Sequence, residues 1–171
     1  MIIKQQSSII TPRFSLRSLD VTENLETYHS WMKDIISNQY ILSTRLDYSM
    51  NELKDYINEI NLLSDAVLLG IFEKKSNRHI GNVKYSKINS PIGSAEMGIM
   101  IGQKELRGQG VAKEVLSACH LWLKIEHLIE KIKIGVNTDN KAALAVYSKL
   151  GFNQIGQSSP NSKSIKMELY L

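Results

Sequence analysis

The stretch ELRGQGVAKEVL, residues 105–116, places two glycines and an arginine directly before a run of helical character. One glycine is enough to begin or end an element. Two glycines leave backbone amides bare and let a ligand approach a helix N-terminus closely. The preceding segment, SAEMGIMIG (94–102), has the pattern of a strand. A glycine-rich turn between a strand and a helix is typical of a phosphate-binding loop.

Three kinds of phosphate loop can be compared with this turn. A Walker loop needs Lys and then Ser or Thr after its last glycine, but Gly110 is followed by Val111 and Ala112. A dinucleotide-binding G-x-G-x-x-G fingerprint would need glycine where Lys113 stands. The remaining pattern is R-x-x-G-x-A, which begins at Arg107. A glycine-containing helix start that binds no ligand stays open as the alternative.

Composition sets the broad class. The 171 residues predict a single domain, 1–171, with a sizeable core. A net charge of +4 is too small and too dispersed to favour nucleic acid as a partner, but it suits an anionic small molecule. Cys119 is the only cysteine, which excludes an internal disulfide and favours a reducing compartment. No apolar run approaches the roughly 20 residues of a membrane span, and the first residues lack a signal peptide's apolar region. We therefore expect a cytoplasmic protein with no nucleic-acid or membrane partner.

Hydrophobic periodicity and capping signals predict the order of elements. Strands are expected at 13–19, 66–74, 79–88, 94–102, 131–137, 152–157 and 163–171, and helices at 23–34, 50–63, 110–127 and 138–150. Asp20 with Glu23, and Ser49 with Glu52, have the spacing of capping pairs. Hairpins mixed with strand–helix–strand units predict an α/β (α+β) fold, with a mixed, mostly antiparallel sheet of six to seven strands and helices on both faces.

The helix after the glycine turn is expected to bury one continuous apolar face. The residues of that face are Val111, Val115, Ala118, Trp122, Ile125 and Ile129. The last predicted helix lies in NKAALAVYSKLGF, residues 140–152, with Gly151 as its C-terminal cap. Asn140 and Tyr147 are seven residues apart, nearly two turns, so they share one helix face.

The two segments together resemble the GNAT family, the acyl-CoA-dependent N-acetyltransferases. The family's R/Q-x-x-G-x-G/A loop has its counterpart in RGQGVA, and its N-x-x-A-x-x-x-Y-x-x-x-G-F segment in NKAALAVYSKLGF, with every named position filled. The order of strands and helices fits over nearly the whole chain. The segments TPRFSLRSLDVTENLETYHSWMKD and AEMGIMIG look like the ribosomal-protein N-acetyltransferase subgroup, although many members with other substrates share them.

The resemblance implies a twisted sheet that splays open between the strands at 94–102 and 131–137, with acetyl-CoA as co-substrate. It implies that the pantetheine arm pairs with the backbone of Ile99, Met100 and Ile101. The pyrophosphate is then expected on six residues: Arg107, Gly108, Gln109, Gly110, Val111 and Ala112. It also implies that Asn140 contacts the cofactor and that Tyr147 lies beside the departing sulfur.

Two side chains are candidates for the chemistry. Tyr147 can act as an acid, because the usual tyrosine pKa of about 10 exceeds the thiol's of about 8.5; its alternative role is packing. Glu96 shares one side of its strand with Gly98 and Met100, and could accept the amine's proton. The resemblance implies a glutamate either here or on the neighbouring strand, where this chain carries Gly135, so Glu96 is the only good acidic candidate. A solvated or ion-paired Glu96, or a reaction without a base, stays open.

The expected function is an N-acetyltransferase that moves an acetyl group from acetyl-CoA to a primary amine of a small molecule or peptide, by direct attack in a ternary complex. The amine could belong to a protein N-terminal residue, an amino sugar or another small molecule. A CoA-binding module without turnover is the alternative, and a ligand-free α/β domain is a third reading. The four histidines (His29, His79, His120 and His127) lack metal-ligand spacing, so no metal is expected. The acceptor stays open, and a monomer or a homodimer is expected.

Overall fold

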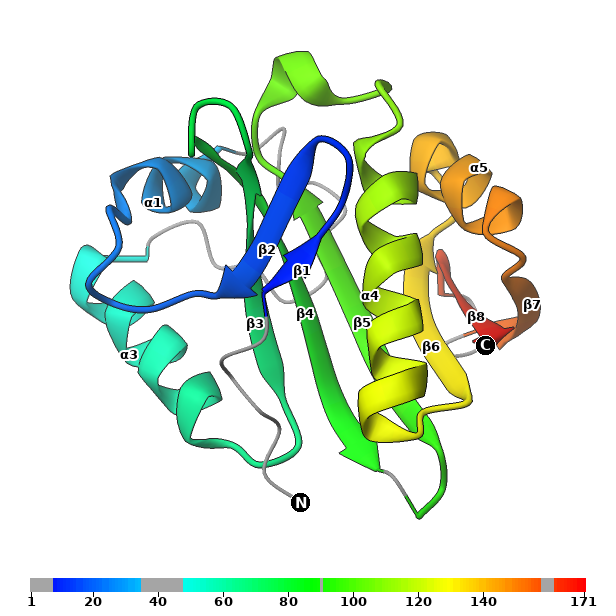
Figure 1. Cartoon of the computed structure of the whole chain (residues 1–171). Coiled ribbons are helices and arrows are strands. Elements are labelled where there is room, and N and C mark those ends of the chain that lie inside the picture. The colour runs from blue at the N-terminus through cyan, green and yellow to red at the C-terminus, as the bar shows by residue number, and fades with distance from the viewer. Residues whose placement is uncertain (1–7, 35–47, 90, 158–161) are drawn as a thin grey trace.

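The structure, a computed structural model, describes residues 8–34, 48–89, 91–157 and 162–171. Its strands form one sheet in the order β1-β2-β3-β4-β5-β6-β8-β7 (Figure 1). The strands are β1 (Ile9–Ile10), β2 (Phe14–Ser18), β3 (Val67–Glu73), β4 (His79–Asn89), β5 (Ser94–Ile101), β6 (Lys131–Asn137), β7 (Asn153–Gln157) and β8 (Ser164–Tyr170). The helices are α1 (Glu26–Lys33), α3 (Met50–Leu62), α4 (Val111–His127), α5 (Lys141–Lys149) and the short 3-10 helix η1 (Lys104–Leu106).

The sheet is mostly antiparallel, as the sequence predicts. Within it, β5 and β6 form the one parallel pair of the described strands, and α4 makes the crossover between them. The described residues form eight strands in this sheet, more than the six to seven expected. The missed strand β1 has two residues and pairs with β2 through Ile9 and Ile10. Two residues are too few to show a period, so the sequence pattern gave no signal for it.

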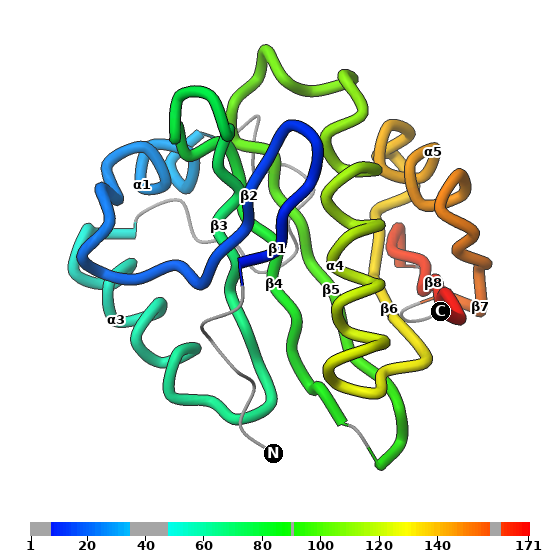
Figure 2. Tube along the Cα trace, in the orientation of Figure 1, coloured from blue at the N-terminus to red at the C-terminus, as the bar shows by residue number. Residues whose placement is uncertain are grey.

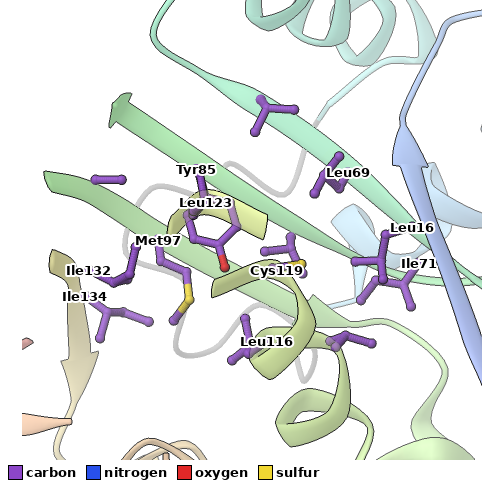
Figure 3. Close-up of a cluster of buried hydrophobic side chains, with 14 of the residues drawn as sticks. Leu16, Leu69, Ile71, Tyr85, Met97, Leu116, Cys119, Leu123, Ile132 and Ile134 are labelled. Atoms are coloured by element: carbon purple, nitrogen blue, oxygen red, sulfur yellow. The ribbon is translucent and has the colours of Figure 1, made fainter. Parts of the chain in front are cut away.

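Helices cover both faces of the sheet. α4 and α5 contribute to one apolar core, and α1 and α3 to the other (Figure 1). Strand β3 shows how alternation divides the layers: Leu69 and Ile71 enter the α4 core, whereas Leu68 and Phe72 enter the α1/α3 core. Figure 3 shows the α4 side, where Leu116, Cys119 and Leu123 of the helix meet side chains of the strands.

The buried face of α4 is rotated from the expected one. Val111 and Val115 are buried as predicted, but Ile125 is 62% exposed. The helix instead buries Leu116, Cys119 and Leu123 against the sheet. The expected spacing is equally compatible with a neighbouring stripe, because α4 carries apolar residues on more than one face. Among the helices that the structure describes, none is long and apolar enough to cross a membrane.

One predicted capping pair is confirmed and the other is wrong. Ser49 caps α3, accepting from the Glu52 backbone at 3.2 Å, while the Glu52 carboxylate accepts from the Ser49 backbone at 2.8 Å. Helix α1 begins at Glu26 without a side-chain cap. Asp20 instead accepts from the Thr22 amide in a local turn. The spacing of a capping box is therefore met by chance in the first pair.

Candidate active site

The parallel pair β5–β6 is short, and the two strands then separate. Pairing joins Ser94–Glu96 to Lys131–Lys133. Beyond it, β5 continues to Ile101 while β6 remains paired with β8 as far as Asn137. Both strands are described in full, so the edge of β5 that faces β6 is unpaired from Met97 onward. The expected splay in the sheet is therefore confirmed.

The free edge of β5 leads directly into the glycine-rich loop and the start of α4. Figure 2 shows the chain leaving β5 and returning into α4, and η1 lies within this connection. Gly108 and Gly110 adopt φ values of 75° and 76°, a left-handed conformation that favours glycine. Gly110 provides no side-chain cap, and the first helical bond is donated by the Glu114 amide to the Gly110 carbonyl at 3.1 Å.

The amides of Val111, Ala112 and Lys113 precede that first bond and have no acceptor within the helix. They lie at the positive end of a 17-residue helix. Gly108 and Gly110 are exposed, and at Gly108 no described atom lies within 4 Å of where a Cβ would be. Bare amides, a helix dipole and open space are what a diphosphate requires.

A hairpin from the other end of the sequence holds this loop. The Arg13 guanidinium donates from Nε to Glu114 Oε2 at 2.7 Å and from Nη2 to the Gln109 carbonyl at 3.0 Å. The Thr11 hydroxyl donates to Glu114 Oε1 at 2.7 Å. These bonds engage the one carboxylate in the first turn of α4. The negative charge of Glu114 is thus neutralised locally, so that it repels an anion at the helix N-terminus less.

Arg107 connects the loop to the end of β5. Its Nε donates to the Ile101 carbonyl at 2.9 Å, and Nη2 lies 3.5 Å from the Gly102 carbonyl. On the β4 side, Ile99 pairs with Val83. Met100 and Ile101 pair with the two residues of β4 that precede Val83. In an antiparallel pair, successive residues point their backbone N–H and C=O groups alternately toward and away from the partner strand, so alternate residues of this segment present those groups to the splay.

Asn140 lies directly before α5, and Tyr147 lies within it. Asn140 is the N-cap residue, and its Oδ1 accepts from the Ala143 amide at 3.1 Å. Tyr147 is only 5% exposed and its ring lies 5.6 Å from that of Phe152. Burial raises the pKa of Tyr147 to about 12. Gly151 follows the helix with φ 92°, which confirms its place as the residue that ends α5.

Glu96 lies at the closed end of the splay. It is the last β5 residue paired with β6, where it faces Lys133, and its side chain is exposed. Its Oε1 accepts from Lys87 Nζ at 2.9 Å. Gly98 follows on the same side of the strand, at the first step beyond the pairing.

Three titratable side chains are buried between α4 and the sheet: His120, Tyr85 and Cys119. His120 of α4 lies with Nε2 3.4 Å from the Met97 sulfur, and burial lowers its pKa to about 4. Tyr85 is fully buried, and its raised pKa is due first to burial and then to neighbouring Cys119. Burial likewise raises the pKa of Cys119 to about 12, which makes it a poor nucleophile at neutral pH. The described residues hold no group of three or more His, Cys, Asp or Glu side chains suited to a metal ion.

Sequence patterns missed several residues that shape the site. Arg13 and Glu114 are 101 residues apart, and no local motif links them. Lys84 and Lys166 become neighbours of the splay only through strand register, opposite Gly98 and Gly135. The signal that could have found them is the register of β4 with β5 and of β8 with β6, which the sequence does not specify residue by residue.

Comparison with known proteins agrees with this geometry. The sequence model of the acetyltransferase (GNAT) domain matches residues 13–153. The chain is 27% identical over 154 residues to an N-acetyltransferase 9-like protein of Caenorhabditis briggsae, covering 85% of this chain and 77% of the relative. It is 26% identical over 157 residues to an N-acetyltransferase 9-like protein of Dictyostelium discoideum, covering 88% and 67% respectively.

Solved structures share the fold at lower identity. A ribosomal L7/L12 alpha-N-protein acetyltransferase in complex with coenzyme A superposes with a TM-score of 0.82 at 19% identity, covering 96% of this chain and 98% of that one. A spermidine N-acetyltransferase from Vibrio cholerae, in complex with CoA and spermine, gives 0.82 at 21% identity, covering 92% and 95%. The family match spans most of the chain and includes both the splayed strands and the loop between them; the chain belongs to the GNAT acetyltransferase family.

Proposed function

We propose that this protein transfers the acetyl group of acetyl-CoA to a primary amine, by direct attack of the amine in a ternary complex, with residues 1–171 acting as one domain. The observation that carries the proposal is the continuity of two binding surfaces. The free edge of β5 ends at Ile101, and the uncapped helix N-terminus begins at Val111. An extended pantetheine chain could pair with the first while a diphosphate lies on the second.

The loop residues fit a diphosphate. Gly108 and Gly110 present no Cβ, and the amides of Val111 and Ala112 have no acceptor in the helix. We propose that Arg107 and Gln109 complete the loop, and that Ile99, Met100, Ile101 and Asn140 hold the rest of the molecule. When bound, acetyl-CoA supplies an activated thioester carbonyl.

The transfer forms a C–N bond and breaks a C–S bond, while the amine loses a proton and the sulfur becomes a thiolate or gains a proton. With a pKa of about 12, Tyr147 stays protonated at neutral pH. Full proton transfer from such a phenol to a thiolate of usual pKa about 8.5 is uphill by about 5 kcal/mol. We therefore assign Tyr147 the role of hydrogen-bond donor to the departing sulfur rather than of full proton donor.

Glu96 is our candidate for the base. It lies next to Gly98 on the same side of β5, at the point where the sheet opens. Lys87 donates to this carboxylate at 2.9 Å, at the edge of the opening. From there it could take the amine's proton directly or through one water molecule.

The test is release of free CoA thiol from acetyl-CoA, measured with a panel of neutral, cationic and anionic amines. We expect release that depends on one class of amine, with an acetylated product of the corresponding mass. Calorimetry with CoA is measured in parallel. CoA binding without thiol release across the panel would indicate a binding module, and absence of both would contradict the proposal.

A further inference from the structure

We propose that the amine acceptor carries an anionic group, and that Lys84 and Lys166 bind it in the open space above Gly98 and Gly135. This inference names the acceptor class and so rests on the proposed acetyl transfer.

Two glycines leave this space open. Glu96 and Lys133 form the last pair between β5 and β6, so the next residues on that side of the two strands are Gly98 and Gly135. A Cβ at Gly98 would meet no described atom within 4 Å, and one at Gly135 would meet only Ser164 Oγ at 3.7 Å. Among the described residues, no side chain therefore fills the mouth of the splay above Gly98, where an acceptor would reach the free edge of β5.

A lysine stands beside each glycine. In the sheet register, Lys84 of β4 pairs with Gly98, and Lys166 of β8 pairs with Gly135. The neighbours of these four residues along each strand enter the core beneath α4, for example Tyr85 and Met167. Both lysines therefore project on the opposite side, the one that α1 and α3 cover farther along the sheet.

Lys84 is held in a partly apolar setting. Its Nζ lies 5.2 Å from the centroid of the Tyr56 ring of α3, and burial lowers the pKa of Lys84. Near it, on the same side of β4, Asn82 is 4% exposed, and its Nδ2 has no hydrogen-bond partner in the described chain. A half-buried ammonium and a spare amide donor both favour an acceptor oxygen that carries negative charge.

The described carboxylates do not neutralise the charges of Lys84 and Lys166. Glu96 is paired with Lys87 at 2.9 Å, and Glu168 lies 3.8 Å from Lys131. Lys133 lies between these two glutamates across the strands. For Lys84 and Lys166, the described residues offer no carboxylate within ion-pair distance. The charge that remains is positive, which disfavours an acceptor with further cationic amines.

Phosphate and carboxylate share this chemistry, so the acceptor test uses two matched pairs. Glucosamine is compared with glucosamine 6-phosphate, and a neutral serine-initial peptide amide with one bearing aspartate at its second and third positions. Spermidine serves as the cationic acceptor. We expect kcat/KM to favour the anionic member of at least one pair by tenfold or more, and spermidine to be the poorest. The pair that responds identifies the anion.

The variants Lys84→Met and Lys166→Met remove charge but keep a long apolar stem. Each should raise KM for the preferred anionic acceptor roughly 10- to 100-fold, the range for a hydrogen bond to a charged group. KM for its neutral counterpart should stay unchanged. Lys124→Met on α4 makes the same change in net charge on the other side of the sheet, and should alter neither KM.

Binding of the same amines to the CoA-loaded protein, followed by NMR, separates this inference from the proposed reaction. Preferential binding of an anionic amine that Lys84→Met abolishes would support the inference even if no acetyl transfer occurred. Equal KM and equal binding for the neutral and anionic members of both pairs would overturn it while leaving acetyl transfer intact. The inference would also be overturned if Lys84→Met raised KM equally for the neutral and the anionic member of a pair.

Discussion

Gly110 offers the sharpest test of the proposed diphosphate site, because charge can be changed there at constant shape. Its φ of 76° is a conformation that Asn and Asp tolerate better than other residues. The only described atom within 4 Å of an added Cβ is Arg13 Nη2 at 3.8 Å. Gly110→Asn and Gly110→Asp should therefore carry nearly the same backbone strain and bulk, and differ in one negative charge.

The size of the effect follows from Coulomb's law. Two unit charges about 6 Å apart, at an effective dielectric constant of about 40, repel each other by about 1.4 kcal/mol, a factor of about ten in affinity. A diphosphate carries two such charges. We therefore expect Gly110→Asp to bind CoA between about 10- and 100-fold more weakly than Gly110→Asn in dilute buffer.

Calorimetric titration of CoA into both variants measures this ratio, and thermal unfolding checks that both remain folded. The ratio should shrink in about 1 M salt, where the screening length falls to about 3 Å. Equal affinities for CoA in dilute buffer, from two folded variants, would refute the reasoning and move the diphosphate away from the N-terminus of α4.

Further expectations concern catalysis and stability. Tyr147→Phe keeps the ring and should lower kcat about 100-fold under conditions where chemistry limits turnover, with little change in CoA affinity; an unchanged kcat would reduce Tyr147 to packing. Glu96→Gln should lower kcat/KM at neutral pH and recover as pH rises and free amine accumulates, whereas a pH–rate profile identical to the wild type would remove Glu96 from the mechanism. The fold lowers the pKa of His120 from 6.5 to about 4, so it binds fewer protons than the unfolded chain between these values. The contribution of neutral His120 to stability is complete above pH 6.5 and is lost as pH falls toward 4. Denaturant unfolding should therefore show the wild type losing on the order of 3 kcal/mol more unfolding free energy than His120→Gln over this range. The same dependence of unfolding free energy on pH in both proteins would contradict this. A Cβ at Gly102 would overlap the ring of Trp31, so Gly102→Ala should cost about 1–3 kcal/mol in unfolding free energy. Gly98→Ala, with no described atom near the added Cβ, should cost little. Equal losses of unfolding free energy in the two variants would argue against packing of Trp31 on Gly102.

The sequence was informative where local chemistry decides the structure. The glycines at 108 and 110 require a special backbone, so the loop before α4 could be predicted without knowing its surroundings. The same holds for the Ser49 cap and for the glycine that ends α5. Alternation predicted the strands that form β2 and β6, and a continuous apolar run predicted β3, which is buried on both sides.

The sequence failed where long-range pairing decides the structure. The buried stripe of α4 depends on which strands lie beneath it, and Ile125 is exposed because that stripe is rotated. The neighbours of Gly98 and Gly135 follow from a register that links strands far apart in the chain. Burial, which also depends on long-range packing, changes the chemistry of Tyr147. The sequence predicts it as an acid from the usual tyrosine pKa, but packing raises the pKa of Tyr147 to about 12.

The bonds from Thr11 and Arg13 to Glu114 bear on how the protein is made. The partners Arg13 and Glu114 are 101 residues apart, so the loop before α4 lacks its support until both have been synthesised. At about 5–20 residues per second, the N-terminal hairpin waits about 5–20 s for its partner to leave the ribosome. Nascent chains arrested at increasing lengths should therefore gain affinity for CoA only after the first turn of α4 has emerged.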